Sequence, residues 1–112
     1  MLEYLLGSIN KERVLFFLNF RGEGYAREIA DYYETDLTPI QNQLNKLEIA
    51  GLLSSKKVGN TKVFEMNPRY PFKEELKALL DKALEFTNET DRNKLIIYRR
   101  RPRRNGKPLW KH

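Results

Sequence analysis

The sequence predicts an α+β fold in which helices come first, a β-hairpin follows, and a last long helix precedes a basic tail. Three observations support this order. Apolar residues recur every three or four positions up to residue 50, the spacing of amphipathic helices. After Gly51 the spacing shortens to about two, as in strands, and from Phe72 it returns to the helical value. We therefore expect one folded domain over residues 1–87 and a basic C-terminal tail over residues 88–112.

The first two expected helices are mostly apolar. Residues 1–7 form a short helix that is too short to stand alone, so its apolar side needs a partner from this chain or a second copy. That side consists of Leu2, Leu5 and Leu6. Asn10 is the expected N-cap of a helix over residues 11–19. The VLFFL core of this helix is apolar on nearly all sides, which predicts burial.

Two further helices are expected over residues 25–33 and 38–50. The RGEG segment before them, residues 21–24, has the composition of a turn. The inner side of the first helix consists of Ala26, Ile29, Ala30 and Tyr33. A four-residue link, 34–37, separates the two helices, and this arrangement fits a helix-turn-helix.

The helix over residues 38–50 has clear start and stop signals. Thr38 is the expected N-cap, Pro39 suits the first turn, and Gln41 completes a capping box. Gly51 supplies the left-handed residue that ends the helix. Its apolar stripe consists of Ile40, Leu44 and Leu47.

The outer face of the same helix is rich in amides and hydroxyls rather than in Glu and Lys. It carries Thr38, Asn42, Asn45 and Lys46, with Pro39 and Gln41 at its flanks. Such groups can bond base edges and phosphates in a DNA major groove. The alternative is a surface helix that is polar without a nucleic-acid partner.

A cationic hairpin follows directly. Residues 52–58 and 62–66 are the expected strands, with residues 59–61 as the turn. Lys56, Lys57 and Lys62 lie near its tip. A hairpin in this position can act as a wing that reaches a phosphate strand. The alternative is an exposed hairpin whose lysines discourage edge pairing.

The last expected helix covers residues 72–87 and is strongly amphipathic. Its apolar face consists of Phe72, Leu76, Leu79, Leu80, Ala83 and Phe86. This stripe is wide for a small domain. Part of it is expected to pack on a second subunit, and otherwise it closes the core of the monomer.

All the excess positive charge lies in the tail. The chain carries a net charge of +6, yet residues 88–112 hold nine Lys or Arg against two Asp or Glu. The remaining residues, 1–87, therefore sum to −1. Cations spaced along a flexible segment give phosphate affinity without sequence choice, although such a tail can also serve only solubility. The expected contacts are Arg99, Arg100, Arg101, Arg103 and Arg104.

The composition argues against an enzyme. The chain has no cysteine, and its one histidine is His112, a poor place for general-base catalysis. No Gly-rich phosphate loop follows a strand, and no metal or cofactor motif is evident. The longest apolar run, residues 14–18, is too short to span a membrane, and no signal peptide is visible, so we expect a cytoplasmic protein without a membrane partner.

In its order of elements the chain resembles the winged helix-turn-helix transcriptional regulators of the ArsR-like and MarR-like kind. The matching segments are YAREIADYY, TPIQNQLNKLEIAGLL and SSKKVGNTKVFEMN, within residues 5–84. The exit from Leu44 to Leu53, of the type L-x-x-L-E-x-A-G-L-L, is the most specific part. LLGSINKERVLFFL and NPRYPFKEELKALL also resemble small winged-helix regulators associated with minimal nucleotidyltransferases.

The resemblance implies a three-helix core with an antiparallel wing, and a homodimer on double-stranded DNA. Base contacts would fall on Thr38, Pro39, Gln41, Asn42 and Asn45. Phosphate contacts would fall on Tyr25, Arg27, Lys46, Lys56, Lys57, Asn60, Thr61 and Lys62. The absence of Cys and of paired His means that the metal-sensing function of some members is not implied.

Three acidic residues near the start of the proposed recognition helix, Asp31, Glu34 and Asp36, count against DNA unless they point away from it or favour the helix N-terminus. The leading interpretation is a transcriptional regulator. The first alternative is a winged-helix module that docks on a partner enzyme. The second is an RNA or nucleoid binder driven by the tail.

Overall fold

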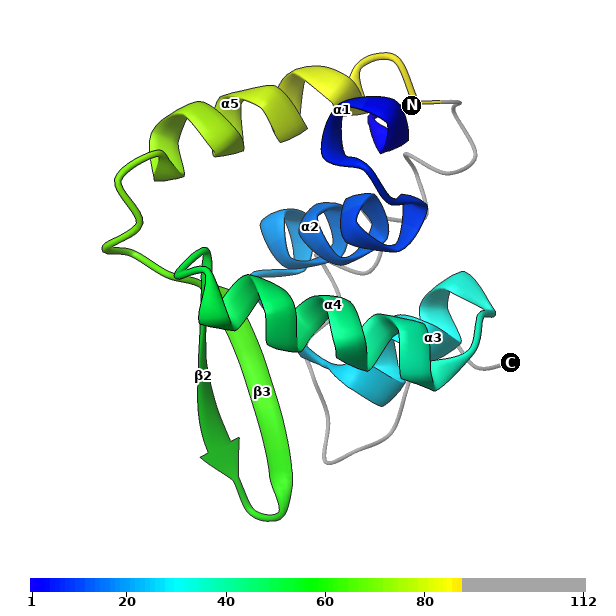
Figure 1. The fold of residues 1–112 in the computed structure, drawn as a ribbon, viewed down its shortest axis with the longest axis vertical. Helices are drawn as coiled ribbons and strands as arrows, with labels where there is room; N and C mark the ends of the chain where they lie inside the picture. The colour runs from blue at the N-terminus through cyan, green and yellow to red at the C-terminus, as the bar shows by residue number, and fades with distance from the viewer. Residues whose placement is uncertain (88–112) are drawn as a thin grey trace.

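Helix α2 (Ile9–Arg21) is the centre of the structure, a computed structural model that describes residues 1–87. Helices α1 (Glu3–Leu6) and α5 (Lys73–Leu84) lie on one side of it, and α3 (Ala26–Tyr33) and α4 (Leu37–Ile49) lie on the other (Figure 1). The strands are β1 (Glu23–Tyr25), β2 (Leu53–Val58) and β3 (Thr61–Met66). The α+β class is confirmed, and the tail lies outside the described residues.

Burial explains the central position of α2. Its VLFFL core is almost completely inaccessible, as expected, and Phe17 meets Tyr32 of α3 edge to face at 5.3 Å between ring centroids. The predicted start was wrong. Ser8 is the N-cap, and its hydroxyl accepts a hydrogen bond from the Lys11 backbone N–H at 3.2 Å. Asn10 lies inside the helix, where its side chain bonds Arg13.

The short helix α1 finds its partner within this chain. Leu2 and Leu6, four positions apart, pack against the core that α2 dominates. Leu5 was expected on the same side but is 68% exposed, because one helical turn can present only a narrow stripe to its neighbour.

The sheet contains a strand that the sequence did not predict. Residues 23–25, expected as part of a turn and the start of a helix, form β1 and pair antiparallel with β3, giving the order β1-β3-β2. Gly24 lies opposite Phe64. It is buried so closely that an added Cβ would lie 2.8 Å from the Phe17 ring. Strands β2 and β3 form the expected hairpin, but its turn is only Gly59 and Asn60, because Thr61, expected in the turn, pairs with Val58 as the first residue of β3.

Helices α3 and α4 are joined by a tight link. Helix α3 ends at Tyr33, and its C-cap, Glu34, has a left-handed φ of 54°. The Thr35 N–H donates to the Ala30 carbonyl at 3.0 Å. The N-cap of helix α4 is Asp36, two residues earlier than the expected Thr38, and the helix begins at Leu37. Thr38 is therefore inside the first turn, and the predicted capping box does not form. Pro39 is in the first turn, as expected.

The exit from α4 is confirmed in detail. Gly51 has a φ of 87°, and its N–H donates to the Glu48 carbonyl at 3.0 Å. The next N–H, of Leu52, reaches back to the Leu47 carbonyl at 3.0 Å. These two bonds define a Schellman stop. The Asn67 side chain then donates to the Gly51 carbonyl at 2.9 Å, which ties the end of β3 to the same turn.

Helix α5 closes the core over α2. Leu80 and Ala83 are buried, whereas Phe72 and Phe86, at the two ends of the expected apolar face, are 62% and 68% exposed. The middle of the face therefore completes the monomer. The expectation that other parts pack on a second subunit stays a prediction.

Candidate nucleic-acid interface

The polar face of α4 is uncovered. Its helical spacing places Ile40, Leu44 and Leu47 in the core and turns the amides outward. Among the residues predicted to contact bases, Pro39 is half-buried and the others are exposed: Thr38, Gln41, Asn42 and Asn45. Lys46, on the same face, is also exposed. The structure therefore brings these predicted side chains together on one accessible surface.

The predicted contacts at the start of α3 differ in access. Tyr25 is the last residue of β1, is paired with Val63, and is half-buried. Arg27 is exposed on the first turn of α3, and no ion pair holds it within residues 1–87. Of the two, Arg27 is the group that is free to meet a phosphate.

The three hairpin lysines have different surroundings. The Lys56 ammonium lies 3.3 Å from a carboxylate oxygen of Glu23. The Lys62 ammonium lies 2.9 Å from the carboxylate of Glu48 on α4 and 5.1 Å from the centre of the Phe64 ring. Lys57 is exposed and holds no ion pair in the described part of the chain. Asn60 and Thr61, at the tip, are exposed as well.

Glu48 is the residue whose role the sequence did not reveal. Its carboxylate accepts a hydrogen bond from the Ser55 hydroxyl of β2 and forms an ion pair with Lys62 of β3. The Ser55 hydrogen bond and, next, the Lys62 ammonium lower the pKa of Glu48 below the ordinary glutamate value. Nothing in the spacing of these residues predicts their meeting, because it depends on how the hairpin folds back against α4.

The acidic residues that counted against DNA lie around the α3–α4 link. Glu34 and Asp36 are exposed and Asp31 is half-buried. Asp36 is the N-cap of α4, where a negative charge interacts favourably with the helix dipole. This gives Asp36 a structural role, while Glu34 remains an exposed anion near the interface.

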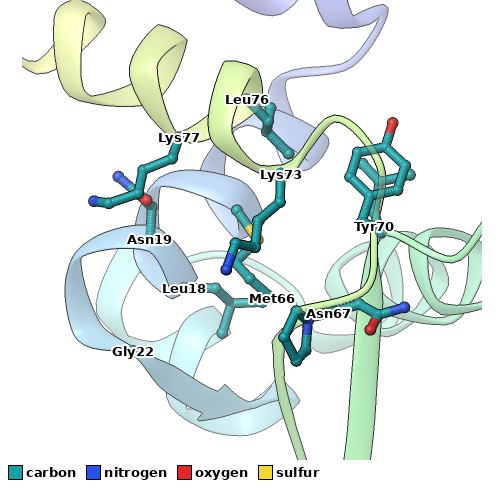
Figure 2. Close-up of a pocket in the computed structure, with 11 residues that line it drawn as sticks. Leu18, Asn19, Gly22, Met66, Asn67, Tyr70, Lys73, Leu76 and Lys77 are labelled. Carbon is teal, nitrogen blue, oxygen red and sulfur yellow. The ribbon is translucent and has the colours of Figure 1, made fainter.

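A pocket of about 240 Å³ lies away from this face, between the end of α2, the Asn67–Tyr70 loop and the start of α5 (Figure 2). Its floor is apolar and includes Leu18, Met66 and Leu76. The polar side chains at its rim already have partners within the chain. Asn19 donates to Asp81 at 2.9 Å, Lys77 lies 3.2 Å from the same residue, and Lys73 lies 3.7 Å from Glu74. The pocket therefore offers mainly apolar contact.

Other kinds of site find little support in the described residues. Within 1–87 no three His, Cys, Asp or Glu side chains are grouped to hold a metal. In the same range no helix combines the length and apolar character that crossing a bilayer requires. The five tail arginines that were predicted to bind phosphates, Arg99 to Arg104 apart from Pro102, lie outside the described residues. No protein-family model matches the chain, and no curated protein matches it either.

Proposed function

We propose that the protein is a DNA-binding transcriptional regulator of the winged helix-turn-helix type. Helices α3 and α4 would be the helix-turn-helix, and β2 and β3 would be the wing. The observation that carries the proposal is the exposed amide and hydroxyl face of α4, with the cationic hairpin directly after it in the chain. Helix α4 has 13 residues and is about 20 Å long, and its diameter of about 10–12 Å with side chains fits a DNA major groove about 12 Å wide.

The exposed side chains suit direct base readout. Asn and Gln amides can bond adenine through one donor and one acceptor, and Thr can bond several base edges. Asn42 and Asn45 are three positions apart, so they lie on the same side of α4. Arg27, Lys46 and Lys57 are exposed cations on α3, α4 and the hairpin, which would allow phosphate contacts on both sides of the reading face.

The tail would add affinity without sequence choice. Its nine basic residues are more numerous than the exposed cations of the proposed interface. About five phosphate contacts from the tail would contribute about −4 to −5 to the slope of log K against log salt. Removing the residues after Tyr98 should therefore weaken binding to all duplexes alike.

The test begins with selection of bound duplexes from a random-sequence library by the full chain. The selected duplex and a shuffled version are then titrated at several salt concentrations. We expect tighter binding to the selected duplex and a loss of preference in Asn42→Ala, whereas Glu74→Ala, an exposed change on α5, leaves it unchanged. Equal binding to both duplexes would remove the regulatory proposal.

We further propose a homodimer, since Tyr4 and Leu5 on α1 and Phe86 beyond α5 expose large apolar side chains. Symmetric dimers are the commonest assemblies, and exposed apolar surface is the usual material of their interfaces.

A second candidate function is a module that docks on a protein partner. The acidic groups at the proposed interface favour it. Two of the three hairpin lysines are paired with Glu23 and Glu48, and Glu34 is an exposed anion beside α4. A basic partner surface would suit these acidic groups. Co-purification of a stoichiometric partner, together with no DNA shift at low salt, would favour this candidate over the first.

A further inference from the structure

The carboxylate of Glu48 joins three elements. It projects from the last turn of α4 and contacts Ser55 on β2 and Lys62 on β3. The Glu48 side chain is 31% exposed, so the contact is partly shielded from water. Glu48 therefore links a helix to both strands of the hairpin at once.

The register of the hairpin explains why the contact is needed. Lys57 and Lys62 are directly opposite each other on β2 and β3. Like charges in this position repel, and their side chains lie on the same face of the sheet as Ser55. Glu48 neutralises Lys62 and so removes much of this repulsion, while Lys57 stays exposed without an ion pair in residues 1–87.

The outer part of the hairpin also has little other support. Strand β1 pairs with β3 only from Val63 to Glu65, so beyond Val63 the hairpin is a two-stranded ribbon. An isolated two-stranded ribbon has marginal stability in water. The tie from Lys62 to Glu48 holds this ribbon at its base against α4.

From this geometry we infer that Glu48 is a positioning residue, which fixes the angle between the hairpin and α4. We call its contacts with Ser55 and Lys62 the clamp, and Lys62 is part of this clamp rather than a phosphate contact. The hairpin's phosphate contact is then Lys57. The part that concerns phosphate contacts rests on the proposed DNA-binding function, whereas the contact between Glu48 and Lys62 is present in the free protein.

The alternative role for Lys62 carries a cost. To reach a phosphate, its ammonium must leave both Glu48 and the face of Phe64. The abandoned Glu48 carboxylate would then lie close to the DNA backbone and repel it. Lys57 meets neither cost, because it has no carboxylate partner among the described residues.

The first experiment needs no DNA. The Glu48 side-chain carboxyl is titrated by NMR in the full chain and in two matched variants, Lys62→Gln and Lys57→Gln. Removal of Lys62 should raise the Glu48 midpoint, and Lys62→Arg should keep it near the parent value. Removal of Lys57 should leave it unchanged. Equal midpoints in the parent and Lys62→Gln would overturn the clamp.

The second experiment measures the salt dependence of binding to the selected duplex. Lys57→Gln should reduce the slope of log K against log salt by about 0.9, the loss of one phosphate contact. Lys62→Gln should weaken binding several-fold at constant slope, because the hairpin is no longer held, and Lys62→Arg should recover the affinity. A slope loss of about 0.9 for Lys62→Gln would overturn the assignment.

The two experiments separate the clamp from the function. If the parent protein binds no duplex, the proposed function fails, and the NMR titration still decides whether Glu48 holds Lys62. If the parent binds selectively and both lysine variants lose the same slope, the function stands, and the assignment of Lys57 rather than Lys62 as the phosphate contact of the hairpin fails.

Discussion

At the scale of single residues, Gly24 has the least room for a side chain among the glycines of residues 1–87. It is buried in β1, and a Cβ there would lie 2.8 Å from Cε1 of Phe17, whose side chain is fully buried. Gly24→Ala should therefore reduce the free energy of unfolding by about 1–3 kcal/mol, the usual cost of overpacking. Urea denaturation followed by circular dichroism measures this change.

The control for that prediction is Ser54→Ala on β2, a half-buried strand position, which should change stability by less than about 0.5 kcal/mol. A Gly24→Ala protein as stable as the parent would show that the Phe17 ring can move aside, contrary to its tight packing.

Glu48 gives a pH dependence of stability. Its pKa is lowered in the folded state, chiefly by the Ser55 hydroxyl and then by Lys62. The stabilisation is therefore fully present above the pKa that Glu48 has in the unfolded chain, and it is lost as the pH falls through the lower pKa of the folded state. Glu48→Gln should flatten this part of the stability profile.

The measurement is the denaturation midpoint of the parent and of Glu48→Gln at several values between neutral and acidic pH. Glu74→Gln, an exposed change on α5, is the control and should follow the parent profile. Parallel profiles for the parent and Glu48→Gln would contradict the role of this carboxylate.

Sequence reasoning at this scale succeeded with the stop of α4 and failed with two caps. Glycine adopts the left-handed conformation without the steric cost that a side chain imposes, so the role of Gly51 could be predicted. Ser8 and Asn10 are both good N-caps, and only the structure shows that Ser8 has the extended backbone that the position requires. Thr38 is not the cap because Asp36, two residues earlier, is the N-cap of the helix.

At the scale of elements, Leu80 is the most deeply buried side chain of α5. Leu80 has no exposed surface and lies in the core cluster that α2 dominates. Leu80→Ala should cost about 2–5 kcal/mol, the range for a leucine that leaves a cavity. Leu5→Ala, at the 68% exposed position of α1, should have little effect. Similar losses in the two variants, measured by denaturant unfolding, would mean that α5 is not part of the core.

The expected helices were identified correctly in number and order because their apolar spacing is a local signal. The strand β1 was missed for the opposite reason. Three residues that include Gly24 carry no alternation of their own, and their strand conformation depends on pairing with β3, which is about forty positions away. The face of α4 could be predicted from spacing, whereas the ion pairs that occupy Lys56 and Lys62 could not.

At the scale of the whole molecule, the exposed apolar residues predict self-association. The full chain should sediment at twice its monomer mass of 13.3 kDa. The double change Leu5→Lys and Phe86→Lys should shift it to the monomer without loss of helix signal, because both side chains are exposed. A parent protein that is monomeric at all concentrations would contradict the proposed homodimer.

The central claim is that the outward face of α4 meets DNA, and the side-chain amides of this face report on it directly. In an NMR titration of the full chain with the selected duplex, the side-chain NH₂ signals of Gln41, Asn42 and Asn45 should shift. The signals of Asn19 and Asn67, which are bonded to Asp81 and to the Gly51 carbonyl, should stay in place. Binding that leaves the three α4 amides unchanged would contradict the account.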